Sequence, residues 1–134
     1  MTLQAPKAAI LLVDDDPDLM RFIAAALGRS GFTVLTAETP QQALLIHSAR
    51  RDEIALLLSD VIMPQMTGVD LAHVLQQTHP ELKVLFMSGY RAAHLQKFGE
   101  VLSAYQVLSK PFTPAELLQA VKSMMDSETM HSGK

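Results

Sequence analysis

Three short and nearly continuous apolar runs constrain the fold of this chain more than any other feature. They cover residues 8–13, 54–58 and 84–87, and each ends on polar residues. Runs of roughly four to eight apolar residues are typical of strands buried on both faces of a sheet. Two weaker runs, 33–36 and 105–108, contain β-branched or aromatic residues and follow polar or turn-forming stretches. The sequence therefore predicts five strands.

Helix start signals lie between and after these runs. Three capping residues each precede a proline, which suits the first helical position: Asp16-Pro17, Thr39-Pro40 and Thr113-Pro114. Glu116 completes a capping box with Thr113. We expect Asp16 to serve only as a helix cap, because a lone Asp after a strand most often has that role.

Two more helices are expected in the middle of the chain. One should run over 68–77, with Leu71, Val74 and Leu75 facing inward and His79-Pro80 ending it. The other should cover 91–102, but Gly99 interrupts its apolar pattern at a helix cost of ~1 kcal/mol. We therefore expect this fourth helix to be short.

Strand and helix thus alternate five times, which indicates an α/β fold. Apolar strands separated by helices predict a doubly wound, five-stranded parallel sheet in a three-layer α/β/α arrangement. A chain of 134 residues has the size of one domain. We place that domain at 8–126 and expect flexible termini at 1–7 and 127–134.

Charge and residue content exclude several classes of protein. Eleven Lys and Arg against fourteen Asp and Glu give a formal charge of −3, which offers no basic surface for a nucleic-acid backbone. There is no Cys, so disulfides, thiolate metal sites and cysteine nucleophiles are ruled out. No apolar stretch approaches the ~20 residues that span a bilayer. We expect a cytoplasmic protein without membrane insertion or direct nucleic-acid binding.

Polar side chains follow four of the five predicted strands. They are Asp14-Asp15-Asp16, Ser59-Asp60, Ser88-Gly89 and Ser109-Lys110. Ligands of doubly wound sheets bind beyond the carboxyl ends of the strands, so these residues should lie together. Unit charges ~4 Å apart repel by roughly 4 kcal/mol at an effective dielectric near 20. The carboxylates therefore require positive charge nearby.

Lys110 supplies one positive charge, and a set of oxygen ligands suits a hard cation such as Mg²⁺. A carboxylate beside a metal, a lysine and a small hydroxyl has the parts that phosphoryl transfer requires. Asp60 is the best-placed nucleophile. The five His residues, at 47, 73, 79, 94 and 131, show no ligand spacing, and we interpret them as surface or partly buried residues.

Four short strings resemble the receiver domains of response regulators, the family that includes the chemotaxis receiver. They are Leu-Val-Asp-Asp-Asp at 12–16, Ser-Asp-Val-Ile-Met-Pro at 59–64 with Gly68, Met-Ser-Gly-Tyr at 87–90, and Ser-Lys-Pro-Phe-Thr at 109–113. One such string would be weak support, whereas four in the correct order and spacing form a specific signature. The resemblance runs from about residue 8 to 125.

The resemblance implies a role for each site residue. Asp60 would become an aspartyl phosphate. Asp14, Asp15 and the backbone carbonyl of Ile62 would join Asp60 in holding Mg²⁺, or Mn²⁺ in its place. Lys110 would contact the phosphoryl group. The chain would be a signalling domain that promotes only its own phosphorylation and dephosphorylation, and not an enzyme acting on other substrates.

The resemblance also implies strand order 2-1-3-4-5 and a cis bond between Lys110 and Pro111. The phosphoryl donor would be a phosphohistidine on a sensor histidine kinase or a histidine phosphotransfer protein. Ser88 would swing to bond the phosphoryl oxygens, and the surface of the fourth helix, fifth strand and fifth helix would then bind a downstream protein. A free-standing regulator and a domain of a hybrid histidine kinase both remain open.

One departure from the family concerns the switch. Val107 stands three residues before Lys110, where many receivers carry a mobile Tyr or Phe. Tyr105 lies two residues earlier on the same strand face, and Tyr90 follows Ser88, but neither matches the family position. We therefore expect a muted or differently routed conformational response.

Three other functions compete with this interpretation. A phosphatase of the haloacid dehalogenase class needs a second Asp two residues after its nucleophile, where this chain has Ile62. An adaptor with a receiver fold that works without phosphorylation would have no need of the complete acidic pair and lysine. A flavin-binding module is discarded, because Asp14 to Asp16 would repel its phosphate.

Overall fold

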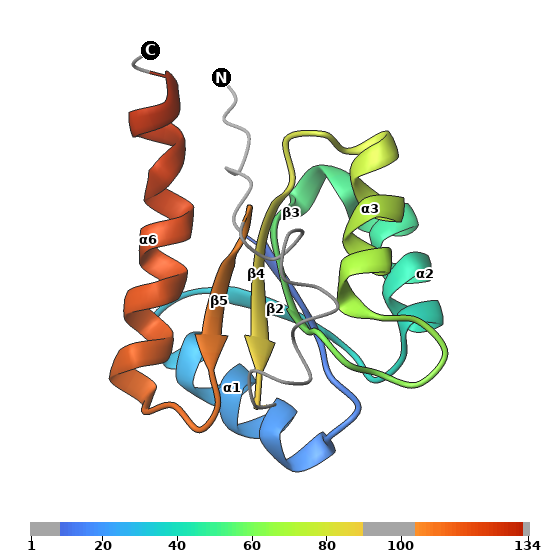
Figure 1. Cartoon of the computed structure of the whole chain (residues 1–134). Helices are drawn as coiled ribbons and strands as arrows, with labels where there is room; N and C mark the ends of the chain where they lie inside the picture. Colours follow the sequence, from blue (N-terminus) through green and yellow to red (C-terminus); the bar gives the residue numbers. More distant parts are fainter. Residues whose placement is uncertain (1–8, 90–103, 133–134) are drawn as a thin grey trace.

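The structure is a computed structural model that describes residues 9–89 and 104–132 (Figure 1). Its five strands are β1 (Ala9–Val13), β2 (Thr33–Ala37), β3 (Ile54–Asp60), β4 (Lys83–Ser88) and β5 (Gln106–Ser109). All are parallel, in the order β2-β1-β3-β4-β5. The predicted α/β class and strand order are confirmed, and each predicted strand lies within two residues of its observed limits.

The described helices begin where the sequence indicates. They are α1 (Pro17–Arg29), α2 (Pro40–Arg50), the short 3₁₀ helix η1 (Arg51–Glu53), α3 (Gly68–Thr78) and α6 (Pro114–Ser132). Asp16 caps α1 by accepting bonds from the N–H groups of Asp18 and Leu19, so its expected role as a cap is confirmed. Thr113 and Glu116 exchange the two bonds of a capping box at 3.0 and 2.9 Å. The predicted helix over 91–102 lies outside the described residues.

Alternating side chains on the strands divide the core into two layers. In β1, Leu11 and Val13 pack with residues of α2 and α3 on one face of the sheet. Ile10 and Leu12 pack with residues of α1 and α6 on the other face. Figure 1 shows α2 and α3 together on the side opposite α6. Both faces of the central strands are therefore buried, which explains their nearly unbroken apolar sequence.

Two expectations differ from the structure. Val74 is 41% exposed, because it lies on the outer side of α3, while Leu71 and Leu75 face the core as predicted. The last helix, α6, is described through Ser132, and the flexible ends expected at 1–7 and 127–134 stay a prediction. His47 and His79 are buried, and their contact is described below. In the described segments, no helix is long and apolar enough to cross a membrane.

Candidate functional site

The carboxyl ends of the strands bring the predicted site residues together. Asp14 and Asp15 follow β1, while Asp60 is the last residue of β3. Ser88 ends β4, and Lys110 follows β5 directly. Because all five strands are parallel, these ends meet at one edge of the sheet.

Three carboxylates form an acidic cluster at this edge. Asp14, Asp15 and Asp60 each offer an oxygen, and these oxygens all lie within 4.8 Å of one another. The Nζ atom of Lys110 donates to Oδ2 of Asp14 at 3.2 Å and to Oδ2 of Asp60 at 3.1 Å. Asp14 and Asp60 are buried, whereas Asp15 is exposed. One ammonium group against three carboxylates leaves two negative charges in excess.

The two buried carboxylates differ in how completely they are bonded. Asp14 accepts a bond from the backbone N–H of Asp16 on Oδ1, at 2.8 Å, and the bond from Lys110 on Oδ2. Asp60 accepts the Lys110 bond on Oδ2, but its Oδ1 is a buried oxygen without a hydrogen-bond partner in the described part of the chain. A buried, unpaired carboxylate oxygen is costly. This atom marks the place where a cation or another ligand would be stabilised.

The pKa values of the pair show that the site is poorly neutralised. Burial raises the pKa of Asp60 above its ordinary value, and the charge of Asp14 adds to that, although Lys110 and the N–H of Ile62 act in the opposite direction. Burial alone would lower the pKa of Lys110, but Asp60 and Asp14 together outweigh it and raise that pKa. The lysine thus stays charged, while Asp60 still lacks sufficient positive charge nearby.

Backbone contacts fix the position of Asp60. The N–H of Gly68 donates to the carbonyl of Val61 at 2.8 Å, and this brings the start of α3 against the end of β3. A Cβ atom at Gly68 would lie 2.2 Å from the backbone oxygen of Asp60, which no side chain can occupy. Gly68 is therefore required by close approach, and its appearance in the second sequence string has this physical reason.

Lys110 is held from the neighbouring strand. Its N–H donates to the carbonyl of Ser88 at 2.8 Å, which extends the β4–β5 pairing by one bond. The bond between Lys110 and Pro111 is cis, as the resemblance implied. A recess of about 390 Å³ lies beside the lysine and is lined by Asp16, Leu19, Gly89, Lys110, Pro111 and Phe112. The recess lies beside the acidic cluster, so a ligand could reach the ammonium group from it.

The structure also places the residues of the expected switch. Ser88 is buried at the end of β4, and Val107 lies in β5 opposite Phe86 of β4. Tyr105, which directly precedes β5, and Val107 pack against the same core layer. The ring of Tyr105 meets Phe86 edge-on at a centroid distance of 5.0 Å, and its hydroxyl donates to Gln76 of α3 at 3.4 Å. No ring fills position 107 itself.

The acidic cluster has the donor set of a site for a hard divalent cation. Its oxygens come from three carboxylates, and carboxylates with retained water are the usual protein ligands of Mg²⁺. The excess of two negative charges matches the charge of such an ion. The Oδ1 atom of Asp60 forms no hydrogen bond with any described residue and is therefore available as a metal ligand. The residues present therefore fit a divalent cation.

Sequence reasoning missed one buried polar contact. His47 of α2 and His79 after α3 are hydrogen-bonded through their rings, although we had interpreted the histidines as surface or partly buried. A signal was available for His47, because it lies four residues after the buried Ala43 and hence on the same helical face. No comparable signal exists for its partner, 32 residues further along the chain.

Comparisons with known proteins agree with this geometry. The family model of the response regulator receiver domain matches residues 10–122. The chain is 33% identical to the response regulator receiver protein CpdR of Brucella abortus over 116 residues, which cover 87% of this chain and 95% of CpdR. It is also 33% identical to the sensor kinase CckA of the same species, over 90% of this chain but only 13% of the kinase.

A solved structure shows the same fold. The crystal structure of the chemotaxis protein CheY4 of Vibrio cholerae superposes with a TM-score of 0.77 at 26% identity. The match covers 87% of this chain and 98% of that one. The sequence matches and the structural match thus both indicate response regulator and chemotaxis proteins.

Proposed function

Because the chain belongs to the response regulator receiver domain family, we propose that Asp60 accepts a phosphoryl group from a phosphohistidine. Members of this family act in two-component signalling, and phosphorylation of an aspartate is one of their general properties. One observation carries the assignment to Asp60. Its Oδ1 is buried and unpaired, although two other carboxylates and an ammonium group lie beside it.

The proposed reaction is a transfer between two side chains. A carboxylate oxygen of Asp60 attacks the phosphorus, the new P–O bond forms, and the P–N bond to the donor imidazole breaks. The imidazole nitrogen keeps the electron pair and takes up a proton. Lys110 lies 3.1 Å from Oδ2 of Asp60 and would neutralise charge on the phosphoryl oxygens. The Ser88 hydroxyl would donate a hydrogen bond to one of those oxygens.

The same residues would hold the cation that the reaction requires. We assign Asp14, Asp15, Asp60 and the backbone carbonyl of Ile62 as protein ligands of Mg²⁺, or of Mn²⁺ in its place. When bound, the ion would neutralise the phosphoryl oxygens and the neighbouring carboxylates. Asp14 is already fixed by its bonds to Asp16 and Lys110, so little reorganisation would accompany binding.

The donor would be a sensor histidine kinase or a histidine phosphotransfer protein, and we place the exchange in the cytoplasm. The output would pass through β5 and α6, the described part of the surface that the family resemblance indicates. Val107 has no ring to move, and Tyr105 is already engaged by Phe86 and Gln76. We therefore expect NMR shifts on phosphorylation to be small and to stay near Asp60. Large shifts throughout β5 and α6 would contradict this expectation.

Intact mass spectrometry tests the phosphoacceptor. The full chain is incubated with acetyl phosphate, once with Mg²⁺ and once with EDTA. We expect a gain of one phosphoryl group that requires Mg²⁺ and is absent from Asp60→Asn. Asp52→Asn is the matched control, because Asp52 is an exposed aspartate of η1, which precedes the amino end of β3, whereas Asp60 lies at its carboxyl end.

Two outcomes would overturn the proposal. A phosphoryl gain that persists in Asp60→Asn would assign the acceptor to another residue. A lack of any gain, both with acetyl phosphate and with a phosphorylated histidine kinase domain as donor, would favour an adaptor that works without phosphorylation.

A further inference from the structure

A pair of buried imidazoles joins α2 to the end of α3. His47 belongs to α2 and His79 follows α3 directly, and the two residues are 4% and 2% exposed. Nε2 of His47 and Nδ1 of His79 are 2.9 Å apart, within hydrogen-bond distance. The site chemistry at the strand ends makes no use of either ring. The contact is therefore a second polar cluster within the fold.

This contact depends on the number of protons that the two rings carry. One of the two facing nitrogens must donate and the other must accept. A neutral pair satisfies this requirement, and so does a pair with one additional proton. With two additional protons, both facing nitrogens carry hydrogen and both rings are positively charged. The bond is then lost, and two buried cations repel each other.

The groups around the pair do not remove this repulsion. Arg51 of η1 adds another positive charge near His47. Glu81, which follows α3 in the chain, has a carboxylate oxygen 3.6 Å from Nε2 of His79, but its side chain is 65% exposed and its charge is thus screened by water. The titratable residues of α3 itself, Asp70 and His73, are exposed.

Other charged groups nearby are engaged with one another. Arg50 donates to Glu53 at 2.7 Å, and Arg51 lies 3.7 Å from Asp52. The strands beneath α2 present apolar side chains to this core layer. Besides the exposed carboxylate of Glu81, the charged residues described near the pair are thus held in ion pairs of their own.

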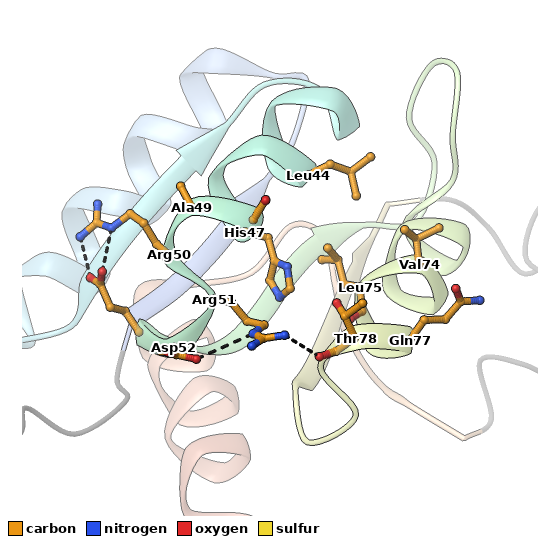
Figure 2. Close-up of a pocket in the computed structure, with 12 residues that line it drawn as sticks. Leu44, His47, Ala49, Arg50, Arg51, Asp52, Val74, Leu75, Gln77 and Thr78 are labelled. Atoms are coloured by element: carbon orange, nitrogen blue, oxygen red, sulfur yellow. Dashed lines mark hydrogen bonds and ion pairs between the residues drawn. The ribbon is translucent and has the colours of Figure 1, made fainter.

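A groove lies beside His47 at the junction that the pair bridges. It has a volume of about 670 Å³ and lies between α2, η1 and α3. Figure 2 shows His47 pointing from α2 toward Leu75 and Thr78 of α3. A second link joins the same two parts of the fold, because the guanidinium of Arg51 in η1 donates to the carbonyl of Thr78 in α3 at 3.1 Å. Imidazoles are the side chains whose charge ordinarily changes near neutral pH, so the pair is the proton-dependent part of this junction between α2 and α3.

We propose that the His47–His79 pair is a proton-operated latch between α2 and the C-terminal end of α3. The latch is closed while the pair carries at most one additional proton, and a second proton opens it. Burial lowers the pKa of His47 below its ordinary value, and the charges of His79 and Arg51 lower it further. Because the folded-state pKa is lowered, the closed state is fully stable above the unfolded value of about 6.5. That stability is lost as the pH falls through the folded-state pKa.

The direct test is a pH titration of the imidazole nitrogens of the full chain by NMR. We expect the ring of His47 to take up its proton at a pH clearly below the ordinary pKa of an imidazole. Hydrogen exchange of amides at the C-terminal ends of α2 and α3, corrected for intrinsic rates, reports opening. As the pH falls, the equilibrium constant for opening should rise by up to about tenfold per pH unit for each proton that opening takes up.

Two variants separate the latch from general acid sensitivity. In His79→Gln, the side-chain amide can accept from a protonated His47, so opening should lose most of its pH dependence. His73→Gln is the matched control on the exposed face of α3 and should behave as wild type. The proposal is wrong if neither ring of the pair takes up its proton below the ordinary pKa of an imidazole. It is equally wrong if wild type and His79→Gln open with the same dependence on pH.

Discussion

Two buried polar clusters lie in different parts of this molecule, and they differ in how fully their polar atoms are hydrogen-bonded. At the carboxyl ends of the strands, Asp60 keeps one oxygen without a partner and negative charge is in excess. Between α2 and α3, the facing nitrogens of His47 and His79 satisfy each other at 2.9 Å. Both clusters join residues far apart in the chain, so sequence distance does not explain the contrast.

The difference lies in what each cluster lacks. The strand-end cluster has three carboxylates and only one ammonium group. Its buried negative charge is therefore destabilising until a cation binds there. The facing nitrogens of the histidine pair form one hydrogen bond, and a second added proton would remove it. An unsatisfied cluster thus marks where a ligand would bind, and a satisfied one marks a structural link that can be broken.

The largest effect is expected from removing the positive charge of the strand-end cluster. Lys110→Met leaves Asp14 and Asp60 as two buried carboxylates without their shared cation. In EDTA at pH 7, the free energy of unfolding should fall by about 3 kcal/mol, measured by urea denaturation. Lys122→Met, at an exposed position of α6, should change it by less than about 0.5 kcal/mol. Equal losses in the two variants would show that the cluster does not depend on Lys110.

The next effect tests the histidine pair. At pH 8, His47→Leu should reduce the free energy of unfolding by about 2 kcal/mol, because Nδ1 of His79 loses its partner inside the core. The double variant with His79→Leu should recover part of that loss, since no unpaired nitrogen remains. If the two single losses instead add fully in the double variant, the hydrogen bond between the rings contributes nothing.

A smaller effect of opposite sign is expected at Asp60. Its folded-state pKa is raised, chiefly by burial, so its charge costs stability at every pH above that pKa and the cost vanishes as the pH falls through it. Asp60→Asn should therefore stabilise the cation-free protein by about 1 kcal/mol at pH 7, with the gain shrinking toward pH ~4. Asp126→Asn, at an exposed position of α6, should show no such gain. Calorimetry in EDTA across this pH range distinguishes the two.

The smallest effect concerns the loop that follows Asp60. Gln65 has φ of 77°, and it is the one non-glycine residue in the left-handed region among those described. Gln65→Gly should raise the free energy of unfolding by up to about 1 kcal/mol, because only glycine adopts this backbone without cost. Gln119→Gly, within α6, should lower it by a similar amount. A loss in both variants would mean that the loop carries no strain at Gln65.

The strand-end cluster was predictable from sequence because parallel topology brings the strand ends together. Once five apolar runs were assigned to strands, Asp14, Asp60 and Lys110 had to meet at one edge. The caps at Asp16, Thr39 and Thr113 were predictable for a similar reason, since a cap is a local interaction between residues within one helical turn.

The histidine pair could not be predicted, because nothing local encodes it. Its bond depends on how α2 and α3 pack, and helix packing is set by many side chains together. Val74 was misplaced for a related reason. Its apolar side chain fits a helical pattern with Leu71 and Leu75. The face of α3 that packs against the core is too narrow to bury all three side chains, and Val74 is the one left exposed.

The close approach of Gly68 to Asp60 bears on how such a chain can diverge over generations. A side chain at position 68 would collide with the backbone oxygen of Asp60, not with its carboxylate. The need for glycine therefore persists even in a descendant that has replaced Asp60 and lost its chemistry. A lineage can therefore keep Gly68 for the fold alone while its acidic residues change. A lineage that replaces Gly68 must change the backbone between β3 and α3.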